Sequence, residues 1–203
     1  MRASPVALLL AGATVTLAAP ARSQMAHPPG MSHAAVVEAA SAGGPDFISH
    51  DATIAWIDQA GAVHVMRPGT NGFTCVIVVP DPFGGPICGD QVAANWVVAL
   101  LTGAAAPPVA AAPGIAYMAR GGAHYEDASG TVVMEHDQSP HAAGTHRVVE
   151  HAHWMLMWPM DPTTSGLPIK ENGTGSYIMF TGTPWAHVMI YQDPNLLHAP
   201  AHN

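Results

Sequence analysis

Short runs of β-branched and aromatic residues, divided by turns rich in proline, glycine and asparagine, set the strongest limit on how this chain folds. Residues 53–57 and 62–67 form the first pair of runs, and the Asp-Gln-Ala-Gly stretch between them predicts a hairpin. Residues 153–158, 177–181 and 187–191 repeat the pattern near the C-terminus. The runs do not alternate with helices, as the strands of a parallel α/β sheet would. The chain is therefore predicted to build a mostly antiparallel sheet.

One principal helix is predicted between residues 91 and 101. Asp90 is a favourable N-cap residue, apolar side chains that include Trp96 and Val97 recur on one helical face after it, and Gly103 ends the pattern. Further strands are expected over residues 73–79, 115–119 and 131–135. Together these elements predict an α+β fold with one principal helix.

The first 23 residues predict a signal peptide. Arg2 precedes an uncharged, largely apolar run over residues 6–19, and small residues at Ala19 and Ala21 match the spacing that signal peptidase accepts. Cleavage after the Ala-Arg-Ser stretch that follows is a second choice. A membrane anchor is the other interpretation, but the run is shorter than the roughly 18 to 20 apolar residues that span a bilayer. We expect a mature protein that is periplasmic or secreted.

Composition predicts a simple organisation for the rest of the chain. Residues 24–50 are rich in Ala, Gly, Pro, His and Ser, which predicts a flexible arm that carries His and Met, with one helical turn over residues 34–40. Residues 51–192 are expected to form a single globular domain, and residues 193–203 a tail. The net charge of −8 argues against nucleic acid as a partner, because phosphate binding needs clustered Lys and Arg.

Cys75 and Cys88 are the only two cysteines of the chain. In an oxidising compartment, two cysteines close in sequence most simply form one disulfide. The alternative is a pair of thiolate metal ligands, which usually has the tighter C-x-x-C spacing. The sequence favours the disulfide.

Several stretches resemble a group of exported bacterial proteins of unknown activity. The stretches are GTNGFTC at residues 69–75, the second cysteine at 88, PGIAYM at 113–118 and the segment 177–189, which ends in GTPWAHVM. The central loop of this chain carries more histidine than that group leads us to expect. The resemblance implies a shared fold and a shared disulfide, and it implies no reaction.

Three His-x-Met units are the most unusual chemical feature of the chain. They occupy residues 64–66, 153–155 and 187–189, whereas 13 histidines and 11 methionines in 203 residues would give about 0.7 such units by chance. On a strand, residues i and i+2 project from the same face, so each unit presents an imidazole beside a thioether. This soft ligand set suits copper, and Cu(I) in particular.

Packing is the other interpretation of these units, because methionine is a common filler of hydrophobic cores. As metal ligands the sequence predicts His153, His187, Met155 and Met189, with His64 and Met66 as weaker candidates. Such a protein would store, deliver or sense copper, or carry out an oxidative reaction at the bound metal.

A second hypothesis is a metal-free enzyme or small-molecule binder. Its pocket would be lined by aromatic residues beside His153 and His187, namely Trp154, Trp158, Tyr177 and Trp185. His124, Glu126 and Asp127 could supply acid and base groups, but no established catalytic motif is present and the catalytic residues stay unknown. A third hypothesis is an interaction module of the cell envelope.

Four further histidines recur every five residues, at His136, His141, His146 and His151. This spacing matches neither one helix face nor one strand face. It predicts an exposed, solvated loop, with weak binding of zinc or copper as the alternative.

Overall fold

The computed structural model describes residues 27–80, 84–133, 144–171 and 175–198. The predicted signal peptide lies outside the described residues, as do the start of the predicted arm, His136, His141 and the last five residues of the predicted tail. In the part of the chain that is described, no helix is long and apolar enough to cross a membrane.

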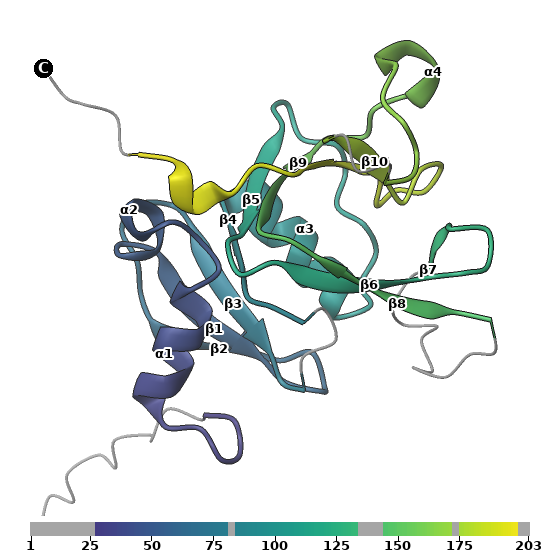
Figure 1. Ribbon diagram of the computed structural model, residues 1–203. Coiled ribbons are helices and arrows are strands. Elements are labelled where there is room, and N and C mark those ends of the chain that lie inside the picture. The colour runs from purple at the N-terminus through teal and green to yellow at the C-terminus, as the bar shows by residue number, and fades with distance from the viewer. Residues whose placement is uncertain (1–26, 81–83, 134–143, 172–174, 199–203) are drawn as a thin grey trace, which may run out of the picture.

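An eight-stranded sheet forms the centre of the molecule, with the strand order β10-β11-β9-β5-β4-β3-β1-β2 (Figure 1). Its strands are β1 (Thr53–Ile57), β2 (Val63–Arg67), β3 (Thr74–Val78), β4 (Ile87–Gly89), β5 (Gly114–Met118), β9 (His153–Met157), β10 (Tyr177–Met179) and β11 (His187–Ile190). A smaller sheet contains β6 (Gly122–Glu126), β7 (Val132–Val133) and β8 (His146–Glu150), in the order β7-β6-β8. Neighbouring strands are antiparallel except for β1 and β3, which confirms the predicted fold class.

The helices are α1 (His33–Ser41), α2 (Asp46–Ser49), α3 (Gln91–Leu101) and α4 (Pro162–Ser165), followed by a short 3-10 helix at Pro194–Leu196. α3 begins where the sequence predicts, because the Asp90 side chain accepts a hydrogen bond from the backbone N–H of Ala93 at 2.9 Å. The second carboxylate oxygen of Asp90 accepts from the N–H of Ile115 at 3.0 Å. One side chain thus caps the helix and ties its start to β5.

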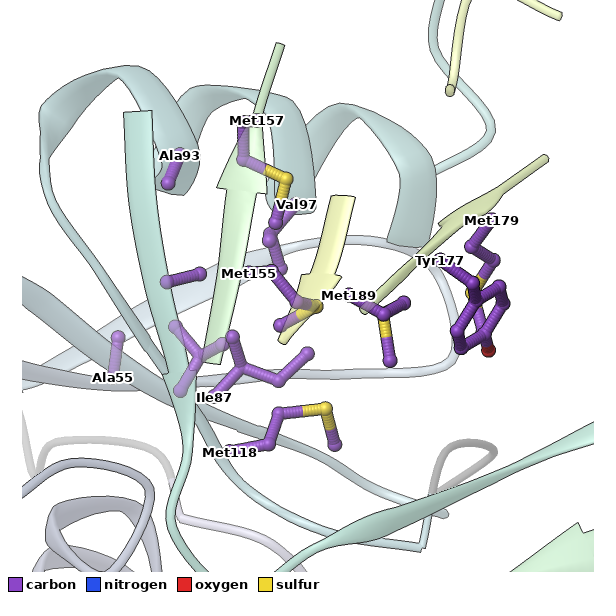
Figure 2. Close-up of a cluster of buried hydrophobic side chains, with 12 residues drawn as sticks. Ala55, Ile87, Ala93, Val97, Met118, Met155, Met157, Tyr177, Met179 and Met189 are labelled. Atoms are coloured by element: carbon purple, nitrogen blue, oxygen red, sulfur yellow. The ribbon is translucent and has the colours of Figure 1, made fainter. Parts of the chain in front are cut away.

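Two hydrophobic clusters lie on opposite faces of the large sheet, because successive strand residues point to opposite sides. On one face, α1 packs on a cluster that includes Ile54, Cys75 and Tyr117. On the other face, α3 packs on a cluster that includes Ala55 and many methionines (Figure 2). The second face is the one that carries the candidate site.

The helical turn predicted over residues 34–40 is the longer helix α1, which packs on the sheet where the sequence predicts a flexible arm. Ser32 caps α1 by accepting a hydrogen bond from the N–H of Ala35 at 3.2 Å. Val36 and Ala40 are completely buried against the sheet. The small residues that made this segment look like an arm allow the helix to pack closely, so the domain includes it.

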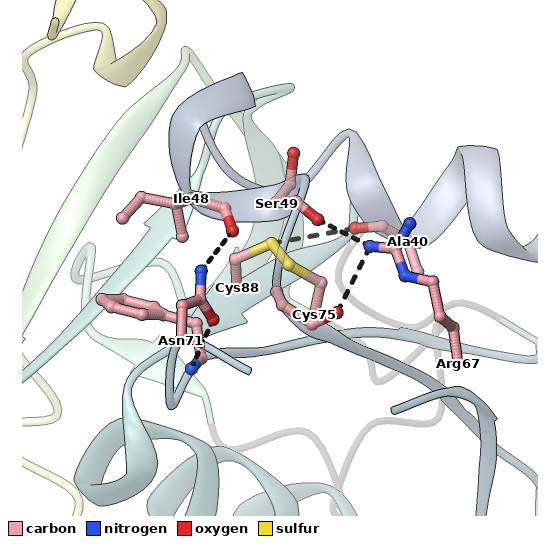
Figure 3. Close-up of a disulfide and its surroundings, with 9 residues drawn as sticks. Ala40, Ile48, Ser49, Arg67, Asn71, Cys75 and Cys88 are labelled. Carbon is pink, nitrogen blue, oxygen red and sulfur yellow. Dashed lines mark hydrogen bonds between the residues drawn. A yellow bond between two sulfur atoms is a disulfide. The ribbon is translucent and has the colours of Figure 1, made fainter. Parts of the chain in front are cut away.

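The predicted disulfide between Cys75 and Cys88 is confirmed. The two residues are direct partners across the antiparallel strands β3 and β4. Both are completely buried, beneath α1 and α2 (Figure 3). Nearby, Asn71 donates a hydrogen bond to the carbonyl oxygen of Ile48 at 2.7 Å, which ties the turn before β3 to α2.

A sharp bend folds the smaller sheet over the methionine-bearing face. β6 follows β5 and β8 precedes β9, so the two strand pairs form one long hairpin that bends between them (Figure 1). Gly121 permits the bend, because its φ is +73° and a Cβ atom there would collide with the carbonyl oxygen of Glu150. Residues His146–Glu150 of the predicted exposed loop form strand β8 instead of a loop, although His146 itself is exposed.

Candidate functional site

Histidine and methionine side chains line one face of the large sheet. In β9, His153, Met155 and Met157 share this face as alternate residues, and all three are buried. Met118 of β5 lies directly opposite His153 across the strand pair. His153 therefore has a thioether beside it on its own strand and another on the neighbouring strand.

The His-x-Met unit of β11 lies on the same face but runs in the opposite direction. Met189 pairs with Met155, so the antiparallel register sets His187 beside Met157 at the far end from His153. The four strand positions between the histidines span about 13 Å. Alternation along each strand predicts that the imidazole and thioether of one unit share a face. The register of β9 with β11 puts both units on the same face, with the thioethers of Met155 and Met189 between the imidazoles.

A cavity of about 50 Å³ lies between this face, helix α3 and the smaller sheet. Its sulfur-bearing walls are Met118, Met155, Met157, Met179 and Met189, all of which Figure 2 labels. Its polar lining consists of His124, Glu150, His153 and His187. The cavity thus brings five thioethers together with three imidazoles and one carboxylate.

The two strand histidines are fixed in the same way. Nδ1 of His153 lies 2.7 Å from the carbonyl oxygen of His151, and Nδ1 of His187 lies 2.9 Å from that of Trp185. A carbonyl oxygen only accepts hydrogen bonds, so each Nδ1 carries a proton and donates it. In the neutral ring, Nε2 then carries the lone pair, which is how histidine ligands of metal ions are commonly oriented.

The second ring nitrogen of His153 makes no hydrogen bond, although it lies within ion-pair distance of Glu150. The residue is completely buried, and its Nε2 is the one buried side-chain nitrogen or oxygen atom, among the residues described, that makes no hydrogen bond. The nearest charged atom is Oε2 of Glu150, at 3.7 Å. Buried polar groups are nearly always hydrogen-bonded, so an unpartnered one next to a cavity indicates a place for a ligand.

A buried carboxylate, Glu150, organises the polar end of the cavity. Its Oε1 accepts hydrogen bonds from Nδ1 of His124 at 2.9 Å, from the hydroxyl of Tyr177 at 3.3 Å and from that of Tyr191 at 3.2 Å. On its other side, His124 donates from Nε2 to Glu126 at 2.9 Å. The imidazole of His124 can donate to both carboxylates only when both ring nitrogens carry protons.

The pKa values follow from these contacts. Burial alone would lower the pKa of His124, but its hydrogen bonds with Glu150 and Glu126 outweigh burial and raise it. Burial alone would raise the pKa of Glu150, but the hydrogen bond from His124, the charge of His124 and the hydrogen bond from Tyr191 lower it. At His187, which has no carboxylate partner among the described residues, burial lowers the pKa to about 4. His124 and Glu150 thus form an ion pair, and His187 is neutral at pH 7.

The ion pair predicts a pH-dependent stability that a His124→Gln variant isolates. Because the pKa of His124 is raised above the value of 6.5 for an unfolded chain, its stabilisation is complete below pH 6.5 and is lost as the pH rises through the folded-state pKa. Glu126 and Glu150 face its two ring nitrogens, and His146 lies near Glu126. The difference in unfolding free energy between wild type and variant, measured with urea, should therefore shrink from pH 6 to pH 9. A constant difference would contradict the pairing.

The third His-x-Met unit belongs to a different region. His64 lies on β2, at the far edge of the sheet and roughly 24 Å from β9 across the strands between them. Its ring stacks on Trp56 at 4.3 Å, and its Nε2 lies 2.9 Å from a carboxylate oxygen of Asp58. Met66 is buried in the cluster beneath α1. These two weaker candidates are therefore not part of the cavity.

The four aromatic residues predicted to line one pocket are not brought together. Trp154 points to the opposite face of β9, where its Nε1 donates to Gln192 at 3.2 Å. Trp158 lies beside a separate surface pocket, and Trp185 packs edge-on against Trp96 at 5.2 Å. Tyr177 alone belongs to the site, through its hydrogen bond to Glu150. Asp127, a predicted acid–base residue, has an exposed carboxylate that instead holds the turn after β6.

Several residues of the site were missed by reading the sequence. Tyr191 continues the alternation of His187 and Met189, so the two-residue period of a strand could have found it. Glu150 carries no comparable signal, because it reaches the site only through the bend at Gly121. Met118 and Met179 come from other strands and depend on the register.

No protein-family model, curated protein or solved structure matches this chain. Within the described ranges, no group of three or more His, Cys, Asp or Glu side chains is placed to hold a metal ion.

Proposed function

We propose that this chain is an exported protein that binds a soft transition-metal ion, copper as Cu(I), in the methionine-lined cavity. His153 supplies the nitrogen ligand, with the thioethers of Met155 and Met118 beside it. His187, with Met157 and Met179, forms a second set of soft donors at the other end of the cavity. The role that follows is to store, carry or sense the metal.

The observation that carries this proposal is the unpartnered Nε2 of His153. It is buried next to a cavity walled by thioethers, and its Nδ1 is fixed by a backbone carbonyl at 2.7 Å. Imidazole and thioether together are soft donors that suit Cu(I). The predicted signal peptide and the disulfide fit an oxidising compartment outside the cytoplasm.

The size of the cavity favours an ion over an organic ligand. Pockets for drug-sized molecules have volumes of roughly 300–1,000 Å³. At about 50 Å³, this cavity has room for a metal ion with a little water. The alternative of a small-molecule pocket would also need the predicted aromatic lining, which the fold distributes over separate regions.

Titration with Ag(I) tests the proposal. Ag(I) is a redox-inert substitute for Cu(I) and needs no reductant, so the disulfide stays intact. The chain from residue 24 onward should bind one Ag(I) tightly. A His153→Gln variant, which keeps a side chain of similar size, should lose more than about tenfold in affinity because it removes the nitrogen donor. Met155→Leu should weaken binding in the same direction.

Matched substitutions in the third His-x-Met unit provide the control. His64→Gln and Met66→Leu make the same chemical changes on β2, outside the cavity, and should leave the affinity unchanged. If the His64 and His153 variants lost affinity equally, or if neither did, the cavity would not be the binding site.

A further inference from the structure

Apolar side chains form the rim of the methionine-lined cavity. The four polar residues that line the cavity are buried, and so are its five methionines. A path from solvent must therefore pass between the lining residues that are only half-buried. These residues are Trp96, Leu100, Leu101, Val133 and Phe180. How a metal ion crosses this rim is a question that rests on the proposed function.

Two aromatic rings of this rim contact His187. The ring centroids of Trp96 and His187 lie 5.0 Å apart, and those of Phe180 and His187 lie 5.6 Å apart. His187 itself is buried, whereas the two aromatic residues reach the surface. The two rings are therefore part of what separates this candidate ligand from solvent.

Phe180 has a strained backbone. Its φ is +54°, and every other described residue with a positive φ is a glycine. A bulky side chain is unfavourable in this conformation, which persists only where surrounding contacts enforce it. Here the carbonyl oxygen of Phe180 accepts hydrogen bonds from the hydroxyl of Thr183 at 2.7 Å and from its N–H at 3.1 Å. Strain of this kind is common at ligand sites, so the position of the ring has a functional meaning.

We infer that the strained turn holds the ring of Phe180 over the cavity, where the ring sets the rates at which the metal ion enters and leaves. A ring across the path is a barrier that entry and release share. It therefore slows both by the same factor and leaves the affinity unchanged. Such retention suits a protein that stores or carries a metal ion, because the ion is not lost quickly to competing ligands. Phe180 acts on the path of the ion and is not one of its ligands.

Transfer of Cu(I) to bathocuproine disulfonate, which becomes coloured when it binds Cu(I), measures the release rate. This chelator is too large for a cavity of about 50 Å³, and ascorbate keeps the copper reduced. Phe180→Gly removes the ring, and glycine adopts the positive φ without strain. The variant should release Cu(I) at least about tenfold faster, while its affinity, from equilibrium competition with the chelator, changes less than about threefold. Phe180→Leu keeps an apolar side chain over the cavity and should release Cu(I) within about threefold of the wild-type rate.

Release from Phe180→Gly at the wild-type rate would overturn the inference and leave the proposed function intact. A loss of affinity as large as the gain in release rate would also overturn it, because the ring would then hold the bound ion instead of blocking its path. If Phe180→Gly does not fold, Phe180→Asn replaces it under the same criteria, since asparagine tolerates a positive φ and its short polar side chain does not exclude water. Absence of Cu(I) binding by the wild type would overturn the proposed function, and the inference with it.

Discussion

Replacing Glu150 by alanine should destabilise the protein by about 3–5 kcal/mol, the usual cost of removing one partner from a buried ion pair. The substitution leaves the buried His124 with one carboxylate in place of two, and it removes the acceptor for the hydroxyls of Tyr177 and Tyr191. Urea unfolding followed by circular dichroism measures the loss.

Glu126→Ala is the matched control for this prediction. It removes the other carboxylate bound to His124, but Glu126 is closer to solvent and has no tyrosine partner among the described contacts. Its loss should be about 1 kcal/mol, as for a pair that water can partly replace. Equal losses for the two variants would mean that Glu150 does not organise the polar end of the cavity.

Removing the disulfide should have the second-largest effect on stability. The Cys75–Cys88 bond closes a loop with a sequence separation of 13. Loops of this size stabilise folded proteins by about 3 kcal/mol, mainly by restricting the unfolded chain. The double variant Cys75→Ala/Cys88→Ala should therefore unfold at a lower urea concentration than the oxidised wild type.

Reduction of the wild-type protein should produce the same loss without a substitution. Adding a thiol reductant should lower the unfolding midpoint of the wild type and leave that of the double variant unchanged. Thiol titration should show two free cysteines after reduction. If the urea unfolding midpoint of this reduced wild type equalled that of the oxidised protein, the bond would have no stabilising role.

Local sequence signals predicted much of the fold. Turn residues and capping predict the hairpin of β1 and β2 and the start of α3 at Asp90. Short runs of strand-forming residues predict β5, β9 and β11, and all these predicted bounds lie within a few residues of the observed ones. The disulfide was also predictable, because the chain contains only two cysteines.

Features that depend on distant contacts were not predictable in the same way. The sequence predicts only one helical turn where α1 forms, because this Ala-rich segment shows little amphipathic pattern. The order of the full helix comes from burying Val36 and Ala40 on a sheet formed later in the chain. The parallel pairing of β1 with β3 has no local signal either.

The candidate site shows the same division. Alternation along single strands grouped His153 with Met155 and His187 with Met189 on one face. The register, which decides that His187 lies beside Met157, depends on how β9 and β11 pair. Glu150 reaches the cavity only because the chain bends between the two sheets. No pattern within a single segment predicts that bend.

X-ray absorption spectroscopy of the Cu(I)-loaded protein tests the central claim most directly. Copper is added to the chain from residue 24 onward with ascorbate, which keeps the metal as Cu(I) and leaves the disulfide intact. A metal in the methionine-lined cavity should show both sulfur and nitrogen neighbours, and the nitrogen contribution should fall in the His153→Gln variant. A spectrum with nitrogen and oxygen neighbours alone, as surface histidines would give, would contradict a copper site in this cavity.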